Sequence, residues 1–257
     1  MREAESPSNA SADLASFLTA LANRIEAVNP ALLRQADDAL LDTLGCIVFG
    51  ADQPWTKAAH RHALATGGDG RCTVVGADRC TTPAMAAFAN GAAAHAFELD
   101  DVHEEAINHP GAVVIPAALA VAEHVGASGH DLLEAIVVGY EAMGRAGIAV
   151  GPTSHMLSGF HPTSMSGVFG SATAAARLLG FDAEQLNHAF GIAATMASGT
   201  MEFVSSGGMT KRIHAARAAE GGVTAAMLVA NGLEGPLDGL AGTYGFCQIF
   251  TDEPRAD

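Results

Sequence analysis

Apolar residues recur at intervals of three and four along most of the chain, the spacing that places them on one face of a helix. In 13–28, for example, Leu14, Leu18 and Ile25 fall on a single face. The same pattern predicts helices at about 13–28, 30–50, 54–67, 82–97, 110–125, 130–150, 163–179, 182–197 and 213–231. Only 71–76, which is short and rich in β-branched residues, is typical of a strand. We therefore predict an all-α fold, a large multi-helix domain.

Local signals mark where several of these helices begin and end. Pro54 stands at a first-turn position, where a proline is favoured because the N–H it lacks would have no helical partner there. Gly67 and Gly68 end that helix. Asp182 with Gln185 three residues later has the pattern of a capping box. These signals support the boundaries that the periodicity suggests.

Three polar loops, at 98–108, 151–162 and 198–208, interrupt the otherwise apolar sequence. No repeat or low-complexity linker divides the chain, so we expect one helical domain over 13–250. The acidic segment 1–12 is predicted to be a disordered lead-in, and 251–257 a polar tail.

Composition narrows the possible classes of protein. Hydrophobic residues make up 49% of the chain but aromatic residues only 5%, so small side chains must form the core and let helices approach closely. The net charge of −15 disfavours nucleic acid and anionic membrane surfaces as partners. The longest apolar run, 111–122, is shorter than the roughly 18 residues that a membrane span needs, and Pro116 interrupts it. We expect this run to be a buried helix.

The N-terminus and the cysteines suggest a location. Residues 1–12 have no apolar segment of the kind found in signal peptides. The four cysteines form no CxxC pair and have no metal-type spacing, so free thiols in a reducing compartment are expected. A cytoplasmic protein is therefore predicted.

The first polar loop is dense in groups that could perform chemistry. Its ionisable residues are Glu98, Asp100, Asp101, His103, Glu104, Glu105 and His109. A solvated acidic loop would explain Glu104 and Glu105, but His109 directly precedes a helix-starting proline, which holds the imidazole in a defined direction. Aspartate and histidine also suit metal ions, although no HxxxH or DxD spacing is present. We predict no metal, and a metal-dependent hydrolase is kept as an alternative.

The other two loops add two more candidate groups. His161 again precedes a helix-starting proline, and imidazole has a reference pKa near neutrality that suits acid–base work. Lys211 and Arg212 follow a glycine-rich stretch at a helix start, where free backbone N–H groups favour anions. An exposed, solvated basic pair would be the simpler explanation of Lys211 and Arg212. However, only 13 residues of the chain are Lys or Arg, so two adjacent ones at a helix start stand out. An anion-binding site is predicted here.

Six short motifs occur in an order that resembles one family. They are ALLDTLGC at 39–46, ANG at 89–91, LDDVH at 99–103, HPGA at 109–112, FHP at 160–162 and TKRIH at 210–214. Together they are similar to the MmgE/PrpD family over about 13–250. That family includes 2-methylcitrate dehydratase, cis-aconitate decarboxylase and an iminodisuccinate epimerase.

The resemblance implies roles for particular residues. His109 matches the family's active-site histidine, His161 its second histidine, and Lys211 its substrate-facing lysine. Glu98 falls on an acidic position where a shorter aspartate is common, and Val102 replaces a frequent threonine. These departures concern the choice of substrate more than membership of the family.

The resemblance also implies a cofactor-free homodimer with a large helical domain, a smaller α/β lid, and an active site between them. Since the chain ends at Asp257, about where such a lid would begin, we expect the lid to be missing, either because the chain is a fragment or because it is naturally short.

The resulting hypothesis is a cofactor-independent lyase-type domain acting on a small di- or tricarboxylate. His109 and His161 would move protons next to a carboxylate, and Asp100 or Asp101 would orient an imidazole. Dehydration, decarboxylation and epimerisation all stay open. Substrate binding is assigned to Lys211 with Arg212, Glu98 and His103. The alternative is a lidless, non-catalytic module that binds carboxylates or dimerises.

Overall fold

The computed structural model describes residues 9–151 and 159–252. Its helices are α1 (Ala10–Ala22), α2 (Ile25–Val28), α3 (Ala31–Gly50), α4 (Pro54–Thr66), α5 (Pro83–Ala94), α6 (Gly111–Val125), α7 (Gly129–Ala149), α9 (Pro162–Leu179), α10 (Ala183–Ala194), α11 (Glu202–Ser206), α12 (Lys211–Ala230) and α13 (Phe246–Phe250). Two-residue strands β1 (Cys72–Thr73) and β2 (Cys80–Thr81) pair antiparallel, with Cys72 opposite Thr81. The all-α prediction is confirmed. Residues 152–158 of the second predicted polar loop lie outside the described part, as do 1–8 and 253–257.

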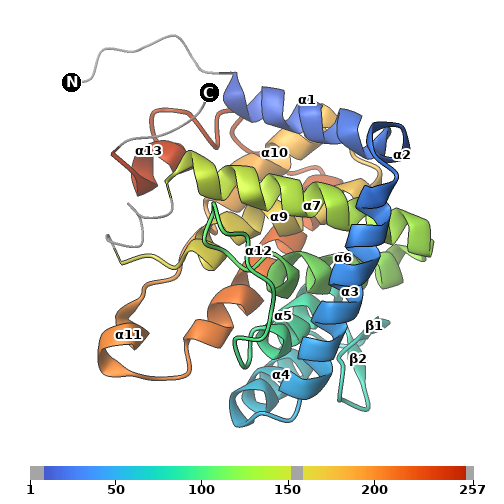
Figure 1. The fold of residues 1–257 in the computed structure, drawn as a ribbon, viewed down its shortest axis with the longest axis vertical. Coiled ribbons are helices and arrows are strands. Elements are labelled where there is room, and N and C mark those ends of the chain that lie inside the picture. The colour runs from blue at the N-terminus through green and yellow to red at the C-terminus, as the bar shows by residue number, and fades with distance from the viewer. Residues whose placement is uncertain (1–8, 152–158, 253–257) are drawn as a thin grey trace.

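Helix α9 lies at the centre of the bundle, between α7 on one side and α12 on the other, with α6 and α10 also against it (Figure 1). Every residue from Pro162 to Ala176 is buried. Helix α5 packs on α6 and α12, and α3 runs along the outside of α5 and α7 (Figure 1). Three segments far apart in sequence, the end of α5 and the starts of α9 and α12, are thereby brought into one region of the molecule.

Small residues allow these helices to approach closely, as the composition suggested. A Cβ atom added to Gly139 of α7 would stand 3.0 Å from the carbonyl oxygen of Gly170 in α9. A Cβ atom on Gly222 of α12 would stand 2.3 Å from the backbone nitrogen of Ala172, also in α9. Since backbone atoms cannot give way as a flexible side chain can, a residue larger than glycine at either crossing would force the helices apart.

The local signals predicted most helix boundaries, and the capping box of Asp182 and Gln185 is present. The predicted helix 13–28 is broken at Asn23, whose side chain turns back to donate to the carbonyl of Thr19. Helix α5 ends three residues earlier than predicted, at Ala94. Within the predicted loop 198–208, the short helix α11 was not expected.

The four cysteines are free thiols. In the part of the chain that the structure describes, none of the helices is both long enough and apolar enough to cross a membrane.

Candidate active site

The loop after α5 folds back so that Asp100 meets the last turn of that helix. Glu98 has a φ of 60°, a left-handed conformation uncommon for a residue with a side chain. This turn places Asp100 Oδ2 2.7 Å from His95 Nδ1, and neither side chain has exposed surface. Because a carboxylate only accepts, the hydrogen of this bond belongs to His95 Nδ1.

Asp101, the next residue, points elsewhere. Its Oδ1 accepts from the backbone N–H of Gly111 at 2.8 Å, and its Oδ2 accepts from the hydroxyl of Tyr140 at 2.8 Å. These bonds tie the loop to the first turn of α6 and to α7. Of the two carboxylates predicted to orient an imidazole, Asp100 is therefore the one whose contacts are with histidines.

His109 stands directly before α6, beside Asp100. Its Nδ1 lies 3.3 Å from Asp100 Oδ2, within ion-pair distance, although no hydrogen bond joins the two atoms in this conformation. Its ring meets that of His95 edge-on, with centroids 4.8 Å apart. With Nδ1 directed at Asp100, Nε2 is the nitrogen left to face another molecule.

The backbone around His109 is fastened to α9. The N–H of His109 donates to Thr163 Oγ1 at 3.2 Å. The side-chain amide of the buried Asn108 donates to Ser166 Oγ at 2.9 Å and to the carbonyl of Met143 at 3.3 Å. Since Thr163 and Ser166 lie in the first two turns of α9, these bonds fix His109 relative to His161 at the start of the same helix.

His161 is the residue before α9 and is almost fully buried. Its N–H donates to the carbonyl of Gly199 at 2.9 Å, which anchors the backbone. Its ring stacks on that of His95 at 5.7 Å and lies 5.3 Å from the ring of His214 in α12. His95 thus contacts both predicted histidines, and we call His95, His109, His161, His214 and Asp100 the histidine cluster.

Lys211 approaches the same cluster from the first turn of α12. Its ammonium group forms an ion pair with Glu98, and the side chains are 20% and 40% exposed. Arg212, predicted to assist it, turns away: its Nε donates to the carbonyl of Ala96 at 3.3 Å, and its guanidinium lies over the ring of Trp55. Lys211 is therefore partly exposed and paired with a loop carboxylate, whereas Arg212 holds the loop after α5.

His103 lies apart from the histidine cluster. Its Nδ1 accepts from the backbone N–H of Ala106 at 3.2 Å, and the ring lies against Gly144 of α7. Among the described residues, its side chain makes no hydrogen bond, ion pair or ring contact with His109 or Lys211, although its backbone N–H donates to the carbonyl of Asn108 at 2.8 Å. The loop thus separates two histidines that were both assigned to the site.

The surroundings give the ionisable groups different charges. Burial alone would raise the pKa of Asp100, but the imidazoles of His109 and His95 together lower it. Burial would likewise lower the pKa of His109, but Asp100 outweighs this and raises it above 6.5. Burial and the neighbouring cationic groups lower the pKa of His161 to about 2, and burial, His95 and Lys211 lower that of His214 to about 4. At neutral pH, His161 and His214 are therefore neutral, whereas Asp100 shifts His109 towards its charged form.

Sequence comparison identifies the family. A family profile described as the MmgE/PrpD N-terminal domain matches residues 12–257. The chain belongs to the MmgE/PrpD family.

Curated relatives of this MmgE/PrpD domain include a cis-aconitate decarboxylase-like protein of Aspergillus oryzae, 34% identical over 252 residues, which are 95% of this chain and 52% of the relative. The cis-aconitate decarboxylases of Aspergillus terreus and Homo sapiens are each 33% identical over 226 residues, 86% of this chain and 46% of theirs. The chain spans about half the length of the curated relatives it matches.

Two members of the histidine cluster were not predicted from the sequence. His95 follows the alanine-rich end of α5, so its position in the sequence is typical of a core residue. The one feature that could have indicated a functional histidine is Asp100, five residues later. His214 was quoted only as part of the TKRIH motif, although it lies one helical turn after Lys211 and so on the same face. Long-range contacts, which a single sequence does not reveal, bring both into this MmgE/PrpD site.

Three groups of the cluster could be considered as metal ligands. Among the described residues, His95, Asp100 and His109 offer ligand atoms that all lie within 4.8 Å of one another. A tetrahedral zinc ion with bonds of about 2.0 Å keeps its ligand atoms about 3.3 Å apart. His95 Nδ1 and Asp100 Oδ2 are closer, at 2.7 Å, and a shared hydrogen fits that distance better than an ion does. In this conformation the three groups form a proton-binding arrangement.

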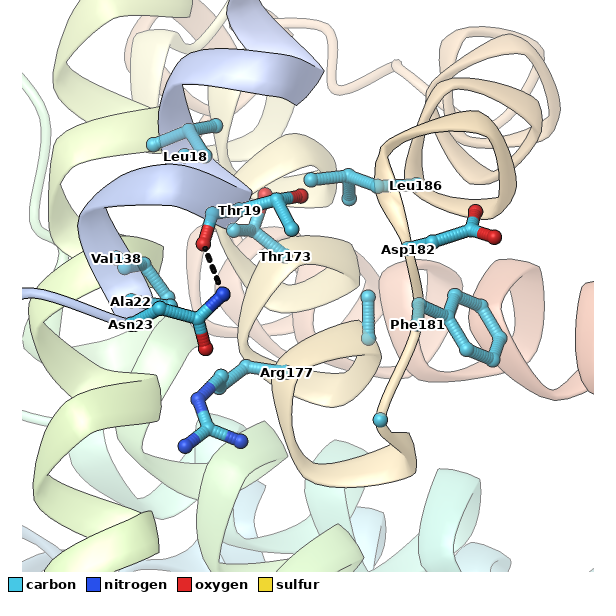
Figure 2. Close-up of a pocket in the computed structure, with 12 residues that line it drawn as sticks. Leu18, Thr19, Ala22, Asn23, Val138, Thr173, Arg177, Phe181, Asp182 and Leu186 are labelled. Atoms are coloured by element: carbon cyan, nitrogen blue, oxygen red, sulfur yellow. Dashed lines mark hydrogen bonds between the residues drawn. The ribbon is translucent and has the colours of Figure 1, made fainter.

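A cavity of 320 Å³ opens between α1, α7 and the C-terminal half of α9, whereas His161 precedes the first residue of that helix (Figure 2). Its lining is largely apolar, with Leu18, Val138 and Phe181 among its residues. The cation at its edge, Arg177, is already paired with Glu134 and with Asp131. The one cation of its lining is thus already neutralised by carboxylates.

Proposed function

We propose that this domain carries the proton-transfer groups of a cofactor-independent, lyase-type enzyme for a small di- or tricarboxylate. The observation that carries the proposal is the different surroundings of two histidines that both contact His95: His109 lies beside Asp100, which stabilises its charged form, and His161 is buried and neutral. Two histidines whose surroundings shift their pKa values in opposite directions can give and take a proton at the same carbon.

Lys211 would bind a carboxylate of the substrate. It is one of only two lysines in the chain, and Glu98 already holds a carboxylate against it. The Glu98 carboxylate marks the direction from which an anion reaches the ammonium group. A substrate carboxylate would displace Glu98 and take over this ion pair.

His109 would deliver the proton. Its charged form is favoured by Asp100, and its Nε2 is left free of that contact. Asp100 in turn is held by His95, so the His95–Asp100 pair keeps the His109 ring oriented and its charge balanced. His161, neutral because of burial, would accept or return the second proton where the reaction needs one.

The relatives favour decarboxylation among the possible outcomes. They are cis-aconitate decarboxylases by name, and cis-aconitate is a small unsaturated tricarboxylate. When a carboxylate leaves as CO2, the electron pair of the broken bond stays on the substrate's carbon skeleton and must be taken up by a proton. The cluster supplies such a proton donor, so cis-aconitate is the first substrate to test.

We also propose a homodimer, as the family resemblance implies. Native mass spectrometry at micromolar concentration tests this directly. A monomer mass under conditions that keep the chain folded would contradict it.

The experiment that tests the function follows hydrogen exchange at carbon as well as turnover. The purified chain is incubated with cis-aconitate, citrate or 2-methylcitrate in D2O, and the substrate is followed by proton NMR. We expect deuterium to enter at the carbon next to a carboxylate, with or without loss of CO2. Replacing His109 by Ala should reduce the rate by about 10²–10⁴.

The other outcomes are equally decisive. Carboxylate binding by calorimetry without exchange or turnover would favour the non-catalytic module over an enzyme. Normal exchange by H109A would remove His109 from the mechanism.

A further inference from the structure

His161 and His214 face each other through the same ring nitrogen. Their Nδ1 atoms lie 3.3 Å apart, and their rings are tilted by 43°. His161 directly precedes α9 and His214 lies in the first turn of α12, so the contact joins two helices that pack together in the core. At this distance one nitrogen can donate a hydrogen and the other accept it.

Neighbouring rings hold the two imidazoles in place. Phe203 of α11 lies edge-on to both, 6.1 Å from His161 and 5.5 Å from His214 between centroids. His95 stacks on His161 at 5.7 Å. Turning either imidazole over would put a carbon where its Nδ1 now stands, so the nitrogen–nitrogen contact would be lost.

The hydrogen count allows only two arrangements. A neutral imidazole carries one hydrogen on its two nitrogens, and burial lowers the pKa of both rings so that both are neutral at pH 7. If His214 Nδ1 donates, the hydrogen of His161 is on Nε2. If His161 Nδ1 donates, its Nε2 carries a lone pair, and the hydrogen of His214 is on Nε2.

We propose that His214 is a positioning residue that sets the tautomer of His161 through this Nδ1–Nδ1 hydrogen bond. His161 Nε2 is then a proton donor in one arrangement and an acceptor in the other. The catalytic consequence rests on the proposed function, whereas the paired tautomers exist with or without turnover. His214 needs no contact with the substrate to play this part.

Conversion between the two arrangements balances in protons. His161 Nε2 gives one proton to the substrate carbon, the hydrogen on His214 Nδ1 moves to His161 Nδ1, and His214 Nε2 takes one proton from water. One proton has then passed from solvent to substrate, and both rings are neutral again. The reverse sequence removes a proton from carbon.

The first test observes the tautomers themselves. Long-range proton–nitrogen correlation spectra of the ¹⁵N-histidine-labelled protein at pH 7 show which nitrogen of each ring carries hydrogen. We expect opposite tautomers, Nδ1–H on one of the pair and Nε2–H on the other. Nε2–H on both rings would overturn the inference, because two lone pairs would then face each other.

The second test uses two variants of one position. H214F keeps a ring against Phe203 but has no nitrogen, whereas H214N places an amide near the position of Nδ1 that can donate or accept. We expect H214F to lower kcat by about 10-fold to 100-fold with little change in KM, and to change the tautomer of His161. H214N should recover most of the loss in kcat.

Equal losses in both variants, or an unchanged His161 tautomer in H214F, would overturn the inference. Thermal unfolding of each variant shows that the fold is intact. If the wild-type chain turned over no carboxylate, the proposed function would fail, but the spectra would still decide whether the two rings share a hydrogen.

Discussion

The Nδ1 atom of His95 lies 2.7 Å from Oδ2 of Asp100, and both side chains are fully enclosed by protein. This bond joins two residues five positions apart at the end of α5 and presents the same carboxylate oxygen to His109. A buried carboxylate between two imidazoles stays ionised only because they surround it. The charge on His109, and with it the proposed chemistry, therefore depends on a residue that touches no solvent.

Replacing Asp100 by Asn should reduce activity far more than stability. Without the negative charge, the pKa of His109 falls, so the proton donor is less populated at neutral pH. We expect kcat to fall by about 10²–10⁴, and the alkaline limb of the kcat profile to move to lower pH. Steady-state kinetics from pH 5 to about 9 would show both effects.

The matched control is Asp101→Asn, one residue away. Asp101 binds Gly111 and Tyr140, and an amide nitrogen cannot accept from one of these two donors. We expect the free energy of unfolding to fall by about 1–3 kcal/mol, with less than a tenfold change in kcat. If both variants lost activity equally, the separate roles given to the two carboxylates would be wrong.

Replacing Glu98 by Gln should tighten substrate binding. The Glu98 carboxylate competes for Lys211, so removing its charge frees the ammonium group for a substrate carboxylate. We expect KM to fall about 3-fold to 10-fold, as suits a partly exposed ion pair. Glu104→Gln on the same loop, where the side chain is exposed, is the control. A rise in KM would instead mean that Glu98 itself contacts the substrate.

Replacing Lys211 by Met should weaken binding of every carboxylate substrate. We expect KM to rise by about tenfold or more, and the dependence of wild-type KM on salt to diminish in the variant, because the lost interaction is electrostatic and 20% exposed at the lysine. The other lysine of the chain, Lys57, is exposed and pairs with Asp52, so Lys57→Met is the control. Equal effects of the two variants would point to net charge rather than to a site.

The stability of the protein should decrease as the pH falls from about 6.5 towards 4. His161 and His214 have folded-state pKa values below 6.5, so in this range the unfolded chain binds more protons than the folded one, and acidification favours unfolding. Removing His214 in H214F should reduce this slope. Urea unfolding at a series of pH values measures it, and an identical slope in the variant would show that His214 does not titrate in this way.

Replacing His103 by Ala should leave KM nearly unchanged, within about twofold, since its half-buried ring shares no side-chain contact with the histidine cluster or with Lys211. The ring lies against Gly144 and accepts from a backbone N–H of its own loop, apart from the histidine cluster. The measurement is KM for cis-aconitate in parallel with that of the Lys211 variant. A comparable rise in KM in the His103 and Lys211 variants would mean that His103 does contact the substrate.

The sequence by itself determined the helices, because each must bury an apolar face and therefore repeats apolar residues every three or four positions. The many small residues indicated that these helices can cross closely, as α7 and α9 do at Gly139 and Gly170. The motifs determined the family and named His109, His161 and Lys211 as candidates. All of these features depend on local spacing or on composition, which a single chain displays directly.

Only the tertiary structure decided which of two adjacent residues contacts the histidine cluster. Asp100 and Asp101 are adjacent, yet the left-handed turn at Glu98 aims the first at His95, and the second is bound by Tyr140 of another helix. Lys211 and Arg212 are successive residues of α12, and their side chains point about 100° apart around the helix. Only Arg212 therefore lies over the ring of Trp55. The physical reason is that side-chain direction and pKa depend on contacts between segments far apart in sequence. Burial and neighbouring charges, set by those contacts, raise the pKa of His109 and keep His161 neutral.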